Sequence, residues 1–469
     1  MSDGISRANI KKTLHFVKRN GIKNTCYAIG ERLAARRQSL YRYTPPEEQE
    51  LERQRTVCRT STPVHTISIV VPCYHTAPKY LLEMIESVRQ QTYPLWELIL
   101  ADATEDDSVE QVVRTVEDAR IFYVRLAENK GIAENTNRGI ERASGDYVGL
   151  LDHDDLLAPD ALYRMAVAIS RGIKAGIKPV LLYSDEDKCD DAGVSFYEPN
   201  IKEDFNLDLL LSNNYVCHFM VVERALIKEL KLRQEYEGAQ DYDLVLRAAA
   251  RLGGREERIV HIPRVLYHWR CHEASTAENP ESKLYAYEAG RRAVQSFLRE
   301  KNWAAVVKDT IHLGFYEIGY PSDIFKARKD VGAVGGPLIY RGRIFSGRLS
   351  ESGKVYYRGL NCHYSGYLHR AMLNQDAAAV DLRNMRLRPE LKGILESVTG
   401  VSYKELNNKG IFDANVLPPN TDILALSISL GKAIRDAGYR ILYLPQQRTS
   451  IKNVWLVKNG KSNDCYTEL

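Results

Sequence analysis

In Gly145-Asp146-Tyr147-Val148-Gly149-Leu150-Leu151-Asp152-His153-Asp154-Asp155, a short apolar segment runs directly into three carboxylates. Residues 147–151 predict a buried strand, because they are apolar, few and preceded by a Ser-Gly turn signal. Ligands of open parallel sheets bind at the carboxyl ends of the strands, where carboxylates two residues apart can hold a divalent cation and its substrate phosphates. The alternative is an acidic loop that caps the helix expected to begin at Pro159.

Strands and helices alternate along the chain from Thr66 onward. Strands are expected at 67–71, 98–101, 121–126, 147–151 and 180–183, and helices at 80–91, 108–117 and 131–143. This order predicts a Rossmann-like, doubly wound, mainly parallel α/β sheet. Acids follow three of these strands (Asp102; Asp152 and Asp154; Asp185 and Asp187), so we expect them at one edge of the sheet. An acid cluster without a cation repels itself, which favours a cation and phosphate site over a capping loop.

The N-terminal segment is strongly basic. The chain of 469 residues has a net charge of +4, but residues 1–42 alone carry ten Lys and Arg against two acids. Apolar residues recur at helical spacing over 10–40 with a break at Asn20-Gly21, which predicts two basic amphipathic helices. Such helices either lie on an anionic membrane surface or pack on the next domain with their lysines in solvent. Residues 42–59 are expected to be a linker with a helical second half, so that 1–62 form the first segment.

Composition excludes several classes of protein. A net charge of +4 is too small to indicate a nucleic-acid partner. No segment approaches the ~20 apolar residues of a membrane-spanning helix, and the N-terminus lacks the apolar core of a secretory signal, so we expect a cytoplasmic protein. The eight cysteines contain no CxxC pair and are interpreted as reduced thiols.

Seven short motifs follow one another between residues 66 and 276. They are Ile67-Ser68-Ile69-Val70-Val71-Pro72, Ser87-Val88-Arg89-Gln90-Gln91-Thr92-Tyr93-Pro94, Glu128-Asn129-Lys130-Gly131-Ile132, Leu151-Asp152-His153-Asp154-Asp155, Tyr183-Ser184-Asp185-Glu186-Asp187-Lys188, Gly238-Ala239-Gln240-Asp241-Tyr242-Asp243-Leu244 and Tyr267-His268-Trp269-Arg270-Cys271-His272. In this order and spacing they closely resemble the inverting family 2 glycosyltransferases with the GT-A fold, of the bacterial surface-polysaccharide and rhamnosyltransferase type. The resemblance implies a glycosyltransferase domain over 63–300.

The resemblance also implies a role for each motif residue. Asp241 is expected to be the catalytic base, and Asp154 with His272 to hold Mn²⁺ or Mg²⁺, His272 being favoured over His268. Contacts with the nucleotide-sugar are expected from Pro72, Asp102, Asn129, Gly131, Asp152 and Arg270. Contacts with the donor sugar or acceptor are expected from Asp185, Asp187, Lys188, Asn214, His218 and His268. The family more often has Asp-Gly where this chain has Ala103-Thr104, so that loop is expected to differ.

Residues 301–469 begin a new pattern. Segments 329–340 and 437–445 resemble the later half of a second glycosyltransferase domain. The stretch that would carry its carboxylate cluster retains only Asp422, and no Asp-x-Asp follows a strand. The resemblance therefore implies a degenerate accessory domain without catalysis of its own.

Together these features imply an enzyme that moves a hexose from a UDP- or dTDP-linked sugar to a hydroxyl of a glycan. The acceptor is expected to be a lipid-linked oligosaccharide for a bacterial surface polysaccharide, met at the inner face of the plasma membrane. One alternative is a non-catalytic scaffold that binds nucleotide-sugar or glycan, although such a protein would not need the base Asp241. Another is nucleotidyl transfer, which normally uses a Gly/Arg/Lys-rich phosphate loop that Pro72-Cys73-Tyr74-His75 does not provide.

Overall fold

The computed structural model describes residues 7–36, 41–61, 64–272, 284–402, 417–418 and 420–451. The chain forms two compact units. The large-sheet unit comprises residues 41–205 and 214–301, and the small-sheet unit comprises residues 1–40, 206–213 and 302–469. This division differs from the expected boundaries, because the segment 1–62 is shared between the two units and residues 206–213 leave the large-sheet unit.

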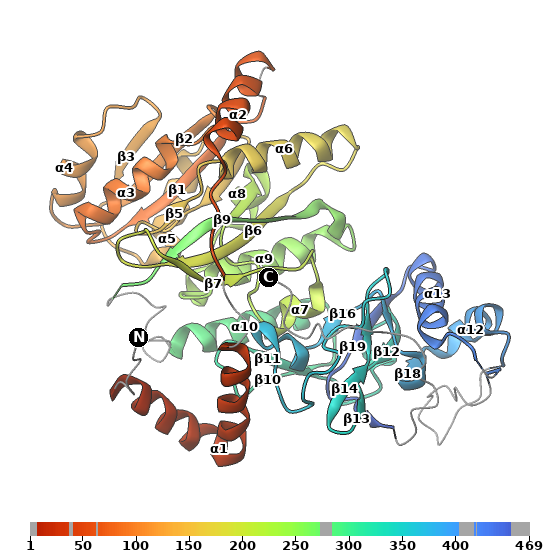
Figure 1. The fold of residues 1–469 in the computed structure, drawn as a ribbon. Helices are drawn as coiled ribbons and strands as arrows, with labels where there is room; N and C mark the ends of the chain where they lie inside the picture. The colour runs from red at the N-terminus through yellow and green to blue at the C-terminus, as the bar shows by residue number, and fades with distance from the viewer. Residues whose placement is uncertain are drawn as a thin grey trace. The chain divides into compact units, whose positions relative to one another are not determined.

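The large-sheet unit is built on one nine-stranded sheet with the order β3-β2-β1-β4-β8-β6-β9-β5, and β7 pairs with β6 (Figure 1). Its strands are β1 (Ile67–Cys73), β2 (Trp96–Asp102), β3 (Ile121–Arg125), β4 (Tyr147–Leu150), β5 (Leu156–Leu157), β6 (Leu181–Cys189), β7 (Phe196–Asn200), β8 (Met220–Glu223) and β9 (Ile259–Arg270). The adjacent strands β3, β2, β1 and β4 run parallel to one another, and β6 runs parallel to β9. The strands β5, β7 and β8 pair antiparallel with their neighbours in the sheet. The expected α/β fold with a mainly parallel sheet is confirmed.

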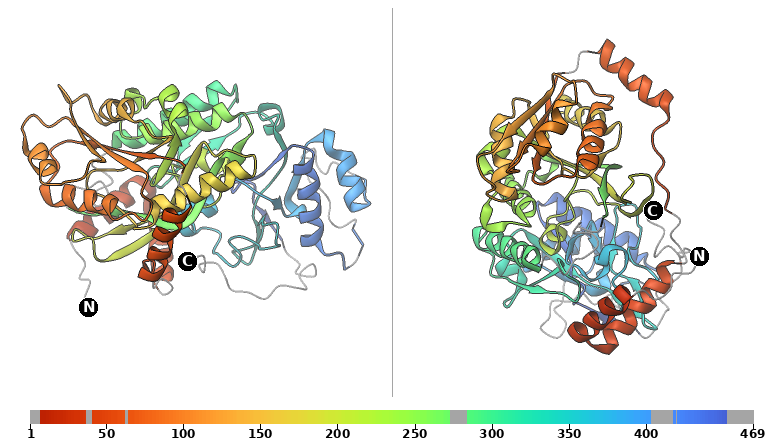
Figure 2. Two further views of the ribbon diagram at one scale, coloured as in Figure 1. Left: turned by 90° about the horizontal axis from the view of Figure 1, so that it is seen from above. Right: turned by 90° about the vertical axis from the view of Figure 1, so that its left-hand side faces the viewer.

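Helices cover both faces of this sheet (Figure 2). They are α2 (Glu48–Thr60), α3 (Pro78–Arg89), α4 (Ser108–Arg114), α5 (Ile132–Arg142), α6 (Ala161–Lys174), α8 (Arg224–Leu230), α9 (Gln240–Leu252) and α10 (Leu284–Glu300). Alternate residues of β1 face opposite sides. Ile69 and Val71 join the core formed with α3 and α6, whereas a Cβ on Gly139 of α5 would lie 2.4 Å from Val70. Gly139 thus allows α5 to approach the other face closely.

The strand expected at 180–183 is longer than predicted, which is a correction. β6 continues to Cys189, so Asp185 and Asp187 lie inside a strand and not in a loop after it. Asp187 is directly opposite His268 of β9 in the parallel register, with 2.6 Å between its Oδ1 and the imidazole Nδ1. Hydrogen bonds with histidines of the neighbouring strand allow an acidic run to remain in a central strand.

The small-sheet unit contains a four-stranded sheet with the order β16-β19-β12-β18 and three smaller pairings. Its strands are β10 (Val306–Asp309), β11 (Tyr316–Gly319), β12 (Val331–Gly335), β13 (Leu338–Tyr340), β14 (Arg343–Ser346), β15 (Arg348–Leu349), β16 (Gln375–Asp376), β17 (Ala379–Val380), β18 (Met385–Leu387), β19 (Arg440–Tyr443) and β20 (Thr449–Ser450). Its helices are α1 (Arg7–Arg36), α7 (Leu207–Ser212), α11 (Ile324–Ala327), α12 (Lys392–Thr399) and α13 (Ile423–Asp436). Asp422, the one acid left in the expected cluster, caps α13 by accepting from the backbone N–H groups of Leu424 and Ala425.

Two local features shape helices of the small-sheet unit: a buried ion pair that anchors α7 and a bend within α1. In α7, the Asp208 carboxylate receives two hydrogen bonds of 3.0 Å each from the Arg328 guanidinium, and both side chains are fully buried. In α1, Gly21 has φ 77° and ψ 164°, so the helix bends there into two segments (Figure 1). The break predicted at Asn20-Gly21 is therefore confirmed. No helix among the described residues is long and apolar enough to cross a membrane.

Candidate functional site

The loop that follows β4 is held in place by the end of β9. The Asp155 carboxylate is buried and accepts hydrogen bonds from the Arg270 backbone N–H (2.7 Å) and from the Tyr267 hydroxyl. The Arg270 guanidinium donates through Nε to the Asp154 carbonyl oxygen at 2.7 Å. Burial raises the pKa of Asp155 well above its ordinary value, and the neighbouring acids add to this effect. Asp155 therefore supports the loop, while Asp152 and Asp154 remain partly accessible.

Asp154 and His272 form the pair best suited to a hard divalent cation. Asp154 Oδ2 lies 2.9 Å from His272 Nε2, and both side chains are partly exposed. The His272 ring stacks on Tyr80 with 4.9 Å between ring centroids, which fixes its direction. Two ligands bound at about 2.1 Å in neighbouring octahedral positions lie about 3 Å apart, so this pair fits one edge of a Mg²⁺ or Mn²⁺ coordination sphere.

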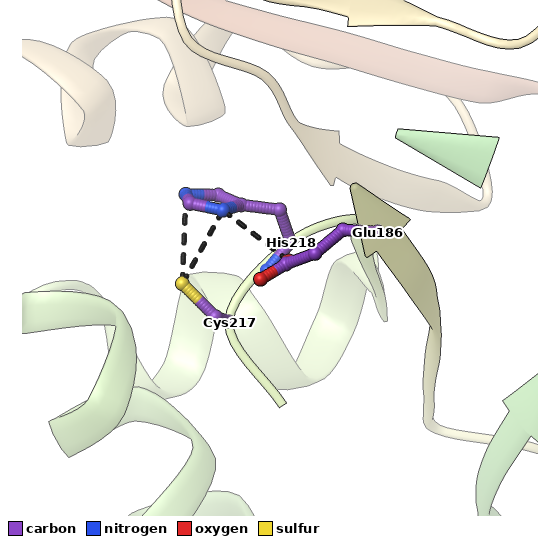
Figure 3. A group of neighbouring side chains, drawn as sticks. All are labelled: Glu186, Cys217 and His218. Atoms are coloured by element: carbon purple, nitrogen blue, oxygen red, sulfur yellow. Dashed lines mark hydrogen bonds and ion pairs between the residues drawn. The ribbon is translucent and has the colours of Figure 1, made fainter. Parts of the chain in front are cut away.

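A second group with possible metal ligands lies beside Asp152. The ligand atoms of Glu186, Cys217 and His218 are within 4.8 Å of one another (Figure 3). Lys202 changes the chemistry of this group, because its ammonium lies 3.1 Å from Glu186 Oε2 and its side chain is fully buried. Burial raises the pKa of the Cys217 thiol to about 11. A neutral thiol and a carboxylate already paired with lysine do not favour a divalent cation here.

His218 connects this group to the loop after β4. Its Nδ1 lies 3.5 Å from Glu186 Oε2, and its Nε2 lies 3.6 Å from Asp152 Oδ2. The ring stacks on Tyr267 at a centroid distance of 4.7 Å and an interplanar angle of 10°. Burial opposes a charge on the imidazole, but Cys217 and Glu186 beside it raise the pKa of His218 well above its ordinary value. The His218 imidazole thus lies between the carboxylates of Glu186 and Asp152.

Asp241 lies in the first turn of α9, where the helix dipole favours a carboxylate. Its Oδ2 accepts a hydrogen bond of 2.7 Å from the Asn214 side-chain amide. Burial is the main cause that raises the pKa of Asp152, and the charges of Asp154 and Asp241 act in the same direction while His218 acts against them. The charges of Asp154, His218 and Asp241 thus all act on the Asp152 carboxylate.

Other predicted site residues are used within the protein. Asp185 pairs with His261 at 2.9 Å, and Asp187 accepts from the Tyr41 hydroxyl at 2.6 Å in addition to its contact with His268. Both aspartates and His268 are buried. These contacts favour local structure for the three residues, and we leave them out of the proposed site. Lys188, also predicted to meet the sugar, pairs with the exposed Glu198 at 2.6 Å.

Arg270 is another residue whose expected role changes. Its side chain has no exposed surface and contacts Glu83 Oε2 at 2.7 Å and the Asp191 carbonyl oxygen at 2.6 Å. With the Asp154 carbonyl as a further acceptor, this guanidinium offers no accessible group to a diphosphate. These contacts favour a role for Arg270 in positioning the loop after β4 over a role in diphosphate binding. Lys202 lies outside all seven motifs, and Glu186 and Tyr267 lie within motifs but were given no role, because their partners are distant along the chain.

The expected nucleotide loops lie at the ends of β1 and β2 and at the start of α5. Pro72 is paired with Ala101 in the β1–β2 ladder, and the oxygens of Asp102 accept from the Thr104 backbone N–H and the Tyr123 hydroxyl. Asn129 Oδ1 accepts from the Gly131 N–H at 3.0 Å, and Gly131 has φ 91°, which favours glycine. The sequence did not indicate that the carboxylate of Glu237 accepts at 2.6 Å from the Ile132 N–H in the first turn of α5.

These features define an α/β protein with a mainly parallel sheet, with acids and a histidine gathered beyond the carboxyl end of β4. Residues 68–231 match the family described as glycosyl transferase family 2. This match covers about a third of the chain and confirms the resemblance stated from the motifs.

Two relatives and one solved structure are similar to parts of this chain. It is 44% identical over 236 residues to the uncharacterized protein y4gI of Sinorhizobium fredii, covering 50% of this chain and 25% of y4gI. It is 34% identical over 259 residues to the O-antigen biosynthesis protein RfbC of Myxococcus xanthus, covering 54% of this chain and 20% of RfbC. The chain thus spans a quarter or less of these two relatives. A crystal structure of Staphylococcus aureus TarS with UDP matches with a TM-score of 0.38 and 19% identity, covering 50% of this chain and 65% of TarS.

Proposed function

We propose that the large-sheet unit is a metal-dependent, inverting glycosyltransferase that moves a hexose from a UDP- or dTDP-linked sugar to a hydroxyl of a glycan. The observation that carries the proposal is the arrangement around Asp152, where the Asp154–His272 pair and Asp241 approach the same carboxylate. A cation-binding pair and a separately held carboxylate are the two groups that such a transfer needs. The family 2 match over residues 68–231 supports the same reaction class.

The reaction divides between a leaving-group side and an acceptor side. In the transfer, the bond from the sugar C1 to the diphosphate breaks, and a bond from C1 to the acceptor oxygen forms on the opposite face. Asp241 accepts the hydroxyl proton, and Asn214 holds one of its carboxylate oxygens through the bond of 2.7 Å. Asp154 and His272 would hold Mg²⁺ or Mn²⁺, which offsets the negative charge that develops on the departing nucleoside diphosphate.

Asp152 and His218 complete the donor side. Asp152 is proposed to accept hydrogen bonds from the ribose. His218, stacked flat on Tyr267, holds its imidazole Nε2 3.6 Å from Asp152 Oδ2. A proton on this ring is proposed to limit the repulsion between Asp152 and its neighbour Asp154. Because the ring also contacts Glu186, its position is set by the buried pair of Glu186 and Lys202.

The acceptor is proposed to be a lipid-linked oligosaccharide that becomes a bacterial surface polysaccharide, with one or a few sugars added. The similarity to RfbC, an O-antigen biosynthesis protein, supports a polysaccharide product. This acceptor is proposed to meet the enzyme at the inner face of the plasma membrane, so the enzyme is proposed to be cytoplasmic. The small-sheet unit is proposed to be accessory to this transfer.

Calorimetric titration of UDP and dTDP, each with and without Mn²⁺, tests the proposal. Wild-type protein is expected to bind one nucleotide only in the presence of the metal, and Asp154→Ala and His272→Ala are each expected to weaken this binding by tenfold or more. Asp436→Ala is the control, because Asp436 is an exposed acid of α13 in the small-sheet unit. Binding that ignores both the metal and Asp154 would overturn the metal site and favour a scaffold that only binds glycan or nucleotide.

A further inference from the structure

The second segment of α1, from Ile22 onward, packs on the small-sheet unit through one defined face. Tyr27 stacks on His363 with 4.5 Å between ring centroids. The Glu31 carboxylate accepts hydrogen bonds from the backbone N–H groups of Ser365 (3.0 Å) and Gly366 (2.6 Å). A Cβ on Gly30 would lie 2.7 Å from the Tyr364 hydroxyl, so the helix approaches this loop closely. These contacts fix the rotation of the helix about its axis.

The opposite face of the same segment is apolar and exposed. Ile22, Ile29 and Leu33 expose 73%, 47% and 59% of their surface, and Cys26, between them, is also exposed. Their spacing of four, three and four residues places them in one stripe along the helix. Single exposed apolar residues are ordinary, whereas a continuous stripe on a soluble domain indicates a binding surface. We call these four residues the α1 stripe.

Basic side chains flank the α1 stripe. Lys18, Lys23 and Arg32 are exposed. Glu31 is the only acid between residues 16 and 33, and its carboxylate is turned toward Ser365 and Gly366. The exposed side of this segment therefore carries positive charge with no acid to balance it.

We propose that the α1 stripe docks on the surface of an anionic lipid bilayer, with its apolar side chains below the headgroups and Lys18, Lys23 and Arg32 among the lipid phosphates. Charge complementarity favours this occupant, because an apolar stripe rimmed only by cations matches the anionic headgroup layer. The α1 helix is too polar to span a bilayer, so it lies on the surface. The fixed face at Tyr27 and Glu31 makes α1 a rigid attachment between the bilayer and the small-sheet unit. Docking of the α1 stripe on a bilayer does not depend on the proposed transferase reaction.

Vesicle co-sedimentation of the full chain tests the inference. Vesicles contain phosphatidylcholine with about 30% phosphatidylglycerol, or phosphatidylcholine alone. The wild type is expected to partition onto the anionic vesicles at least tenfold more strongly than onto the neutral ones, and about 0.5 M salt is expected to weaken this binding by screening. The triple variant Ile22→Ser/Ile29→Ser/Leu33→Ser, called the α1 variant, is expected to partition onto the anionic vesicles at least tenfold more weakly than the wild type.

A matched control separates the α1 stripe from exposed apolar surface in general. Phe122→Ser/Ile173→Ser/Ile177→Ser changes three apolar residues of the large-sheet unit that expose 41%, 39% and 42% of their surface, and it is expected to partition like the wild type. Equal partitioning of the wild type and the α1 variant would overturn the inference. The inference would also be overturned if the wild type did not bind vesicles but dimerised with rising concentration in light scattering, and the α1 variant did not dimerise. A second copy of the chain would then cover the α1 stripe. The α1 variant is expected to retain metal-dependent UDP binding. This measurement distinguishes a failure of the proposed catalytic site from a failure of membrane docking.

Discussion

Lys202→Met is expected to destabilise the large-sheet unit by about 3 kcal/mol at neutral pH. The Lys202 side chain has no exposed surface, and its Nζ lies 3.1 Å from Glu186 Oε2 and 2.7 Å from the Val216 carbonyl oxygen. Removing one partner of a buried ion pair costs about 3–5 kcal/mol, because the other charge remains buried without compensation. A carbonyl that loses its donor adds to this cost.

The pKa of Glu186 gives a second value for the free energy that the fold supplies to this buried carboxylate. Burial raises this pKa, but Lys202 and then His218 lower it from 4.5 to about 2. A shift of this size corresponds to about 3 kcal/mol of preference for the carboxylate in the folded protein. Because the folded pKa is below the unfolded one, this stabilisation is complete above about pH 4.5 and is lost as the pH falls toward 2. In Lys202→Met the buried Glu186 takes up a proton more readily, so the difference from the wild type narrows as the pH falls through this range.

Urea unfolding followed by circular dichroism, at about pH 7 and about pH 4, measures both effects. Hydrogen exchange of the β6 amides reports the large-sheet unit separately from the small-sheet unit. Lys188→Met is the matched control, because the Lys188 ammonium pairs at 2.6 Å with a Glu198 side chain that is 67% exposed, and such a pair contributes less than about 1 kcal/mol. A second variant, Lys202→Met/Glu186→Leu, is expected to recover most of the loss. A cost for Lys202→Met below about 1 kcal/mol, or a cost that is the same at both pH values, would refute this reasoning.

Two further predictions concern one residue in each unit. Asn214→Ala is expected to lower kcat about 10- to 100-fold with little change in the KM for the donor, because Asp241 loses a hydrogen bond to a charged group worth about 1.5–3 kcal/mol; steady-state kinetics check this, and an effect confined to KM would contradict it. Arg328→Met is expected to cost the small-sheet unit about 3–5 kcal/mol by leaving the fully buried Asp208 carboxylate without its partner. Arg328→Met/Asp208→Leu should regain most of that stability in urea unfolding, and a double variant as unstable as the single one would contradict the assignment.

Sequence patterns were sufficient for the parts of this protein that depend on neighbouring residues. The alternating strands and helices predicted α3, α4 and α5 to within a few residues, because apolar periodicity and turn residues act locally. The Asn20-Gly21 break predicted the bend in α1, since only glycine adopts its backbone angles without strain. The motif after β4 placed Asp152 and Asp154 beside the later residues His272 and Asp241, through its resemblance to a known family.

The sequence by itself therefore determined the order of the elements and the fold class, and it supplied the candidates for the site. Only the tertiary structure decided which charged groups face a ligand and which are used within the protein. Arg270 is buried against Glu83 and the Asp154 loop, and Asp187 pairs with His268, although each has the residue type expected of a ligand contact. Lys202, which no motif indicates, neutralises Glu186 beside the site. These outcomes depend on partners many residues apart, because the free energy of a charge depends on its burial and on the opposite charges that the fold brings near it, and neither is encoded in the residues next to it.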